Sequence, residues 1–197
     1  MIATVHGLVL AGGRSSRMQR DKAALSYHGR TQLQWGVDLL AAHLPRVFVS
    51  VRSDQLADPV RARFECITDT LAGAGPIAGI AAAQSRHPEA AWLVLACDLP
   101  FLDAATVGFL LEHRDPQRQA TAFRSSHDGL PEPLCAIYEP ASAPAITDWI
   151  AGGQVCPRKF LRGADVLLLD EPNPRALDNV NTPDEYGAAV SALAGMP

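Results

Sequence analysis

An apolar run that stops at two adjacent glycines is the feature that most constrains how this chain can fold. Residues 8–11 read Leu-Val-Leu-Ala, and Gly12 and Gly13 follow directly. A short apolar run bounded by glycines is typical of a buried β-strand that ends in a tight loop. Glycine permits positive φ and a close approach of the backbone to a ligand. The pattern predicts a buried strand that leads into a loop wrapped around a bound molecule.

Cationic side chains indicate what that molecule is. Arg14, Arg17 and Lys22 follow the glycines within ten residues. Successive backbone N–H groups in such a loop form an anion-binding nest, and arginine and lysine add charge-assisted hydrogen bonds to phosphate. A strand followed by a plain basic surface turn explains one of these features, but not all of them at this spacing. We therefore expect a phosphate site.

Two common nucleotide motifs are missing from this loop. It has neither the G-x-x-x-x-G-K-[ST] pattern of P-loop proteins nor the G-x-G-x-x-G pattern of dinucleotide-binding folds. An ATPase and a nicotinamide enzyme are therefore disfavoured. The six histidines lie in unrelated contexts and no G-x-S-x-G segment occurs, so no Ser/His/Asp triad can be nominated.

Apolar runs alternate with stretches of helical period through the first half of the chain. The expected strands are 5–10, 46–51, 64–67 and 91–97, and the expected helices are 33–44, 55–63, 76–86 and 103–113. This alternation predicts an α/β fold with a parallel sheet and right-handed crossovers.

The second half is less regular. We expect strands at 120–124, 134–138 and 166–169, helices at 141–150 and 183–193, and a polar turn over 125–133. No repeat, low-complexity linker or credible domain boundary appears, and the length fits one domain.

Asp98 directly follows the most apolar run, 91–97, which should be the central strand. Ligands of open parallel sheets lie outside the carboxyl ends of the strands, where the Gly12-Gly13 loop also falls. Magnesium is usually held by one or two carboxylates and substrate phosphates, so Asp98 is a candidate metal ligand. The alternative is an ordinary turn aspartate before a proline, or a capping group.

Two further features at the same edge leave alternatives open. Asp69 follows the strand expected at 64–67, where it could accept hydrogen bonds from a nucleobase or ribose, or be a simple loop residue. The glycines Gly73, Gly75 and Gly79 surround a helix start at Pro76. They fit a glycine-rich wall beside a base, and equally fit tight packing of a helix on a sheet.

Composition excludes several other classes. The formal charge of −4 and the pI near 5.8 disfavour a general nucleic-acid binder. The four cysteines are widely spaced, without zinc-ligand spacing, and three of them lie in or at the end of apolar runs. They are expected to be reduced thiols. Neither a signal peptide nor a membrane-spanning segment is evident, so we expect a soluble, cytoplasmic protein.

Four motifs together carry a family resemblance. They are Leu10-Ala11-Gly12-Gly13-Arg14-Ser15-Ser16-Arg17-Met18 with Asp21-Lys22, Gly75-Pro76-Ile77-Ala78-Gly79, Cys97-Asp98-Leu99-Pro100, and Asn179-Val180-Asn181-Thr182-Pro183. The chain closely resembles the MobA-type molybdenum cofactor guanylyltransferases from residue 8 to about residue 186. The resemblance implies a Rossmann-like three-layer αβα sandwich with a mainly parallel central sheet. It implies a single nucleotidyltransferase domain over 1–197, with the nucleotide bound by the N-terminal part and the pterin by the C-terminal part.

The resemblance also assigns roles to residues. It implies that Lys22 and Arg17 stabilise the departing pyrophosphate and that Asp98 binds magnesium and takes part in catalysis. The nucleotide-binding residues would be Leu10, Ala11, Gly12, Gly13, Lys22, Asp69 and Asp98, and the pterin-side residues Asn179 and Asn181. In one departure from the family pattern, Gln19 stands where a glycine is usual after Arg-Met.

The implied reaction is transfer of GMP from GTP to the phosphate of molybdenum-loaded molybdopterin, with Mg2+ as cofactor. Its small-molecule partners would be GTP and molybdopterin, and its protein partners molybdenum-insertion proteins or apo-molybdoenzymes; neither nucleic acid nor a membrane is expected. Two alternatives stay open. One is a cytidylyl- or sugar-phosphate nucleotidyltransferase of the same superfamily, and the other an inactive nucleotide-binding adaptor that delivers cofactor to a partner enzyme.

Overall fold

A computed structural model describes residues 2–13, 18, 20–27, 29–69, 71 and 73–194. Within them runs a seven-stranded sheet in the order β3-β2-β1-β4-β6-β5-β7. The strands are β1 (Val5–Leu10), β2 (Val47–Arg52), β3 (Cys66–Asp69), β4 (Ala91–Ala96), β5 (Ala120–Arg124), β6 (Pro131–Tyr138) and β7 (Val166–Asp170). Only β6 runs antiparallel to its neighbours, so the mainly parallel sheet predicted from the sequence is confirmed.

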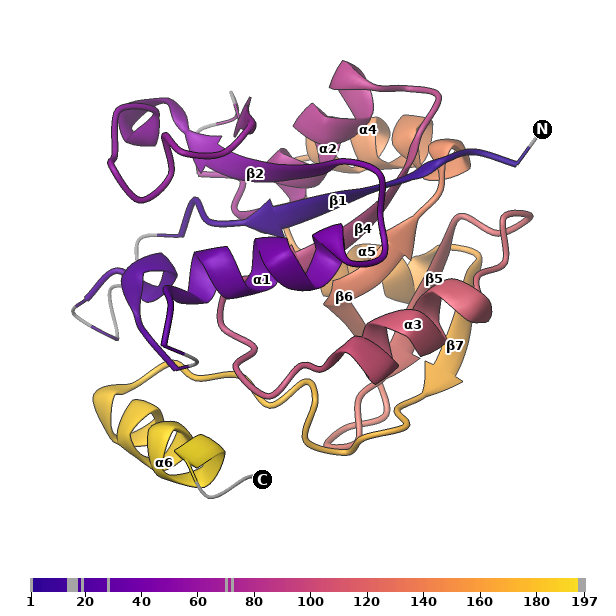
Figure 1. Ribbon diagram of the computed structural model, residues 1–197. Coiled ribbons are helices and arrows are strands. Elements are labelled where there is room, and N and C mark those ends of the chain that lie inside the picture. The colour runs from indigo at the N-terminus through magenta and orange to yellow at the C-terminus, as the bar shows by residue number, and fades with distance from the viewer. Residues whose placement is uncertain are drawn as a thin grey trace.

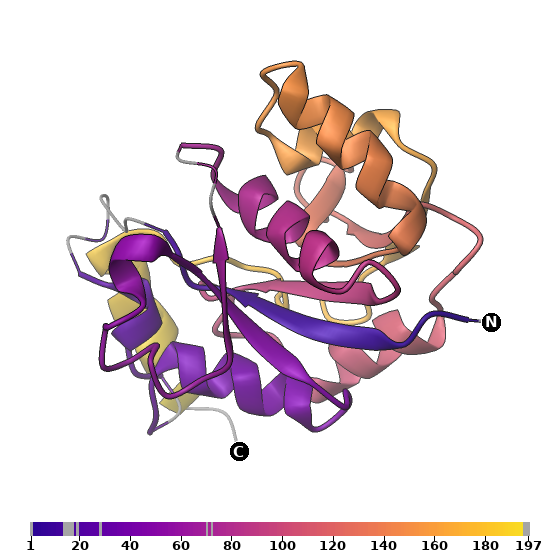
Figure 2. The same ribbon diagram turned by 90° about the horizontal axis from the view of Figure 1, so that it is seen from above.

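Helices cover both faces of this sheet, as Figures 1 and 2 show. One face packs against α1 (Gln32–Ala41) and α3 (Ala104–Glu112), and the other against α2 (Pro76–Arg86), α4 (Ala143–Ala151) and α5 (Pro157–Gly163). Three short 3-10 helices complete the covered chain: η1 (Lys22–Ala24), η2 (Ser53–Gln55) and η3 (Pro140–Ser142). The three-layer sandwich is therefore confirmed.

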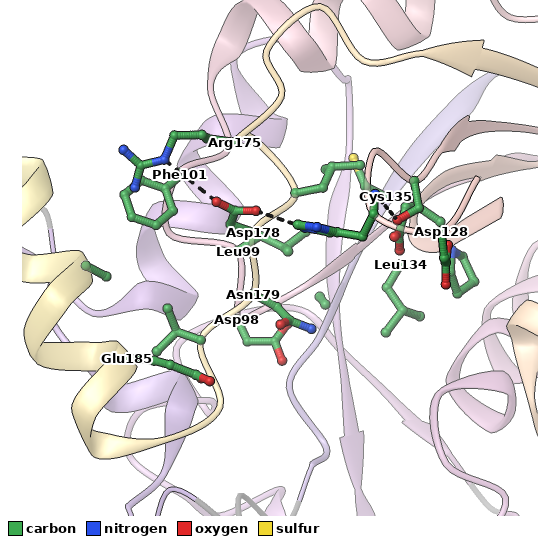
Figure 3. Close-up of a pocket in the computed structure, with 18 of the residues that line it drawn as sticks. Asp98, Leu99, Phe101, Asp128, Leu134, Cys135, Arg175, Asp178, Asn179 and Glu185 are labelled. Carbon is green, nitrogen blue, oxygen red and sulfur yellow. Dashed lines mark hydrogen bonds and ion pairs between the residues drawn. The ribbon is translucent and has the colours of Figure 1, made fainter. Parts of the chain in front are cut away.

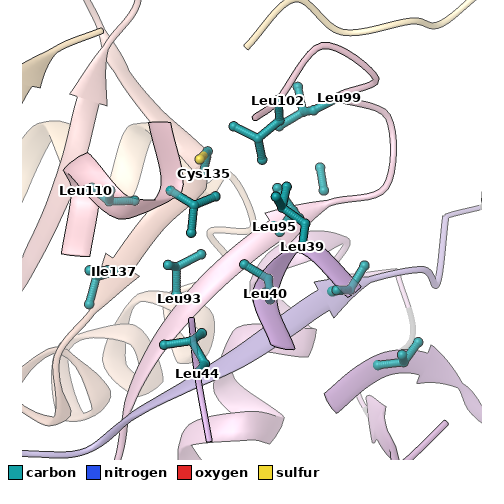
Figure 4. Close-up of a cluster of buried hydrophobic side chains, with 14 of the residues drawn as sticks. Leu39, Leu40, Leu44, Leu93, Leu95, Leu99, Leu102, Leu110, Cys135 and Ile137 are labelled. Atoms are coloured by element: carbon teal, nitrogen blue, oxygen red, sulfur yellow. The ribbon is translucent and has the colours of Figure 1, made fainter. Parts of the chain in front are cut away.

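Strand β4 is the middle strand of the sheet, and all six of its residues are buried. Its side chains alternate between the two faces, as the period of two in a strand requires. Leu93 and Leu95 pack with α1 and α3 (Figure 4), whereas Trp92 and Val94 pack with α2 and α4. A strand apolar on both faces is what a sheet covered by helices on each side demands.

Helix α6 (Pro183–Ala194) lies apart from both layers, beside α1 and the loop that carries η1 (Figure 1). Met18, Leu25, Val180 and Ala189 form a small separate hydrophobic cluster between this helix and that loop. The Tyr186 hydroxyl also donates a hydrogen bond to the carbonyl of Ser26, at 3.1 Å. These contacts join the C-terminal helix to the segment around Lys22.

The helix expected at 55–63 is wrong. The chain forms η2 and then a series of turns. Pro59 lacks an N–H and disfavours the helical region for Asp58. The Asp58 carboxylate also accepts hydrogen bonds from the amides of Val60 and Arg61, at 3.1 and 3.2 Å. This local bonding competes with a helix.

Three other boundaries differ from expectation. Strand β3 begins two residues later than expected, and β6 extends to Pro131, into the segment expected to be a turn. The seven-residue helix α5 was missed because its polar residues hide the apolar period, although Pro157 at its start is a usual helix-opening residue. The remaining expected elements are present, and Asp103 caps α3 as expected, accepting from the Thr106 amide at 2.7 Å.

Candidate active site

The glycine loop leaves the sheet at the carboxyl end of β1. The Ala11 amide still donates to the Ser50 carbonyl of β2, at 3.0 Å, and the chain then becomes progressively exposed through Gly12 and Gly13. Neither glycine has a positive φ. A Cβ on Gly12 would lie 3.6 Å from Asp69 and Arg52, while one on Gly13 would meet nothing within 4 Å. The pair therefore gives an open approach to the backbone, not a left-handed turn.

Three residues that lie far apart in the sequence meet next to this loop. The Lys22 ammonium lies 2.9 Å from the carboxylate of Asp98 and 2.6 Å from the side-chain oxygen of Asn181. The amide of Val180 donates to the Asp98 carbonyl at 3.0 Å, which holds the Asn179–Asn181 segment against the end of β4. Because Leu10 pairs with Ala96, the glycine loop and Asp98 leave neighbouring strands at the same sheet edge.

Asp69 ends β3 at the same edge, on the far side of the glycine loop from Asp98. Burial raises the pKa of its carboxyl, and the nearby Arg52 guanidinium opposes that rise. In the described chain, no hydrogen bond to this carboxylate is found. Asp69 is thus a partly buried acceptor beside Gly12.

A pocket of about 610 Å³ opens on the other side of Asp98, towards β6 and α6. Figure 3 shows Asp98 and Asn179 together in its wall, with Glu185 of α6 at one side and Arg175 and Asp178 at another. The segment 125–135 supplies a further part of the lining.

Charged groups in this pocket are largely paired with one another. Arg158 binds Asp128 at 2.9 Å and Glu132 at 2.8 Å, and Asp178 lies 3.3 Å from the ring of His127. The pocket thus presents both hydrogen-bond donors and acceptors around an apolar floor that includes Leu99 and Leu134. Such a lining suits a polar heterocycle better than a bare anion.

The glycines before α2 divide between the two alternatives. A Cβ on Gly79 would lie 2.4 Å from the Ser50 hydroxyl, so Gly79 allows close packing of the helix on the sheet. Gly73 and Gly75 have φ of 81° and 64°, and a Cβ on either would meet nothing within 4 Å. They shape an open turn at the start of α2.

Sequence reasoning missed two arginines. The Arg61 side chain is 2% exposed and donates hydrogen bonds to the Ala11 carbonyl and to the carboxylate of Asp21. Arg52 donates to the carbonyl of Gly12. Both lie in or near the segment wrongly expected to be a helix, so their inward direction could not be read from a helical period.

Other sequence predictions have mixed outcomes. Arg14, Ser15, Ser16, Arg17 and Gln19 lie outside the described residues. The four cysteines are free, and Cys135 is buried. Burial raises the pKa of the Cys97 and Cys135 thiols to about 12, so both are protonated at neutral pH.

Comparisons with known proteins match this geometry. Residues 7–168 match the model of the MobA-like NTP transferase domain. A protein of Opitutus terrae named a probable molybdenum cofactor guanylyltransferase is 36% identical, over 91% of each chain. A molybdenum cofactor biosynthesis bifunctional protein of Synechocystis is 34% identical over 93% of this chain, which spans 53% of that longer protein.

A solved structure agrees in fold. The molybdopterin-guanine dinucleotide biosynthesis protein A of Archaeoglobus fulgidus superposes with a TM-score of 0.81 at 24% identity. The match covers 97% of this chain and 100% of that one.

Proposed function

Because this chain belongs to the MobA-like NTP transferase family, we propose that it transfers GMP from GTP to the phosphate of molybdenum-loaded molybdopterin. The products are molybdopterin guanine dinucleotide cofactor and pyrophosphate. The observation that carries the proposal is the meeting of Lys22, Asp98 and Asn181 between a glycine loop and a pocket. The name of the Opitutus relative supports guanylyl transfer in particular.

The nucleotide occupies the side of the site between Asp69 and Asp98. The phosphates lie along Leu10–Gly13, where the amides of Gly12 and Gly13 donate to no group in the part of the chain with described placement. Exposed amides of this kind bind anions well. Asp69 accepts hydrogen bonds from the base or the ribose, since its carboxylate has no protein donor there.

Asp98 fits a magnesium ligand. No group of three His, Cys, Asp or Glu side chains among the described residues is arranged to hold a metal. A single carboxylate at the rim of the pocket suits a cation that takes its other ligands from substrate phosphates and water. When bound, Mg2+ would neutralise phosphate charge. Lys22, kept at the site by Asp98 and Asn181, then binds the phosphate oxygens.

The acceptor occupies the pocket on the other side of Asp98. Its pterin lies among the donors and acceptors of that lining, and Asn179 and Asn181 hold its phosphate end. An oxygen of that phosphate attacks the α-phosphorus, the bond to the β-phosphate oxygen breaks, and pyrophosphate leaves. The protein mainly aligns the reactants and neutralises charge, which is what phosphoryl-type transfers require. Arg17 would assist the departing pyrophosphate.

The expected setting is the cytoplasm, with molybdenum-insertion proteins or apo-molybdoenzymes as partners. Across the described chain, no helix combines the length and the apolar character that crossing a bilayer requires.

The test is a transfer assay with purified protein, Mg2+ and molybdopterin, in which pyrophosphate release is followed with GTP and with CTP. GTP should support turnover, and should raise the melting temperature more than CTP does. Faster turnover with CTP would establish a cytidylyltransferase instead. Clear GTP binding without pyrophosphate release would identify an adaptor that has lost catalysis.

A further inference from the structure

Arg61 makes an unusually complete set of bonds for a side chain outside the site. Its Nε and Nη2 donate to the Ala11 carbonyl, at 3.0 and 2.8 Å. Its Nη1 and Nη2 donate to the two carboxylate oxygens of Asp21, at 2.6 and 2.8 Å. Ala11 begins the glycine loop and Asp21 directly precedes Lys22. One guanidinium thus joins two segments that the sequence analysis assigned to phosphate binding.

The bond to Ala11 fixes the direction of the next amide. A trans peptide is planar, so its C=O and N–H point in opposite directions. The Ala11 carbonyl is directed at Arg61, and the Gly12 N–H is therefore directed away from it. Arg52 holds the Gly12 carbonyl in the same way and so orients the Gly13 N–H. Neither amide has an acceptor within the described ranges, so both are oriented but unused donors.

The bonds to Asp21 act on the lysine. The Asp21 carboxylate also accepts from the Ala23 amide, at 3.1 Å, and so caps η1, which begins at Lys22. Burial alone would raise the pKa of Asp21, but the hydrogen bonds and charge of Arg61 outweigh it and hold this pKa below its usual value. Asp21 is therefore a firmly ionised anchor, and its position sets that of Lys22.

We propose that Arg61 is a positioning residue for the nucleotide phosphates: it fixes the Gly12 amide and the Lys22 segment in one frame before the ligand arrives. The inference rests on the proposed function only in taking the ligand to be a polyphosphate. A rigid frame lowers the ordering cost of binding, so its loss weakens binding even where every contacting group remains. Arg61 itself touches no substrate.

A matched arginine separates positioning from plain stability. Arg114 donates bidentately to the Glu139 carboxylate, at 2.6 and 2.7 Å, and to the Ala3 carbonyl, at 2.9 Å. Ala3 precedes β1, as Ala11 follows it. Arg114→Gln removes a nearly identical buried cluster at the opposite end of the same strand and touches no part of the site.

The experiment measures the binding of Mg·GTP and of magnesium pyrophosphate to wild type, Arg61→Lys, Arg61→Gln and Arg114→Gln, together with melting temperatures and KM for GTP and acceptor. We expect Arg61→Gln to weaken both ligands and to raise KM for GTP about tenfold or more. KM for the acceptor should hold within about twofold. Arg61→Lys, which keeps the charge but not the planar fork, should lie in between. Arg114→Gln should lower the melting temperature and leave both affinities unchanged.

A merely structural arginine gives another pattern. If Arg61→Gln melts earlier but binds both ligands and uses GTP with wild-type KM, the inference is overturned. If this variant does not fold, Asp21→Asn decides: it keeps Arg61 and the neutral acceptor but loses the charged fork, and unchanged affinity there also overturns the inference.

Base-free pyrophosphate keeps the two proposals distinguishable. Wild type that binds pyrophosphate but transfers no GMP refutes the proposed function and leaves the effect of Arg61 measurable. Wild type that binds neither ligand overturns both.

Discussion

The two ends of β1 bury the same chemical device for different ends. Arg61 and Arg114 each bind a carboxylate through two hydrogen bonds and a main-chain carbonyl that flanks this strand. At the amino end the cluster is closed, since the next residue, Thr4, also accepts from the Ala91 amide at 3.0 Å. At the carboxyl end the cluster stops short of the oriented amides of Gly12 and Gly13. The difference teaches that what a buried ion pair leaves unbonded marks the functional end of the sheet.

Removing one partner from either buried cluster leaves a charge without its counter-charge, which typically costs about 3–5 kcal/mol. Stability alone therefore does not tell the two ends apart, and a measurement of chemistry has to do so.

The largest expected effect comes from the carboxylate at the chemical end of β4. Asp98→Asn should lower turnover by about 100- to 1000-fold, because a neutral amide neither balances the Lys22 charge nor holds a divalent cation well. Steady-state pyrophosphate release measures this, with circular dichroism to check the fold. The matched control is Glu89→Gln, since Glu89 is an exposed carboxylate just before the amino end of the same strand. Near-wild-type turnover by Asp98→Asn would show that the carboxyl edge is not the catalytic edge.

A smaller effect is expected at the lysine. Lys22→Ala should reduce kcat/KM for GTP by about tenfold or more, because one charge-assisted bond to the phosphates is lost. Lys159, the other lysine of the chain, is exposed on α5 and provides the control Lys159→Ala. Equal kcat and KM in wild type and Lys22→Ala would remove Lys22 from the phosphate site.

The two ends of β1 should also differ in their response to pH. Burial lowers the pKa of His6, and the charges of His87 and Arg46 add to this, while a hydrogen bond and Glu89 oppose it. A lowered folded-state pKa means that the unfolded chain binds the proton more readily. The contribution of His6 is therefore complete above about pH 6.5 and is lost as the pH falls below it. Asp21, with its own lowered pKa, keeps its contribution until the pH falls below about 3.8.

Urea unfolding at pH 7.5 and pH 5.0 tests this contrast. His6 packs on the rings of Phe48, Trp92 and His87, so His6→Phe keeps an aromatic ring there and removes the titration. We expect wild type to lose more unfolding free energy between the two pH values than His6→Phe does. Identical losses would show that the amino end carries no proton-linked stability.

The smallest effect is expected at Asp58, the partly exposed third partner of Arg61. Asp58→Asn keeps an oxygen that can accept from the Val60 and Arg61 amides, and it leaves the bonds to Ala11 and Asp21 intact. The free energy of unfolding should fall by less than about 1 kcal/mol, and GTP affinity should change by less than about twofold. A tenfold loss of affinity would mean that the arginine depends on Asp58 for its direction.

Much of the fold followed from the sequence because burial imposes a simple pattern. Strands β1 and β4 are apolar on both faces, and only a sheet covered by helices on each side accommodates that. The approach of the glycine loop to Asp98 followed as well, since two neighbouring parallel strands end at one edge.

The rest depends on contacts that no local pattern encodes. Lys22 and Asn181 are 159 residues apart, and their pairing depends on how α6 packs against the loop. The inward turn of Arg61 follows from a proline and a side-chain acceptor at residues 58 and 59 breaking a segment with helical period. The pocket-lining segment 125–135 was expected to be partly a turn, because Pro131 and Pro133 disguise the antiparallel strand β6.

The hydrophobic cluster between α6 and the loop around Lys22 has a consequence for how the enzyme matures. Synthesis on the ribosome proceeds from the N-terminus, so β1 to β4 emerge well before Val180 and Ala189. A nascent chain can collapse its sheet early, yet its lysine acquires the Asn181 partner only near the end of translation. Folding and competence are thus separated in time, and a half-made chain does not sequester nucleotide.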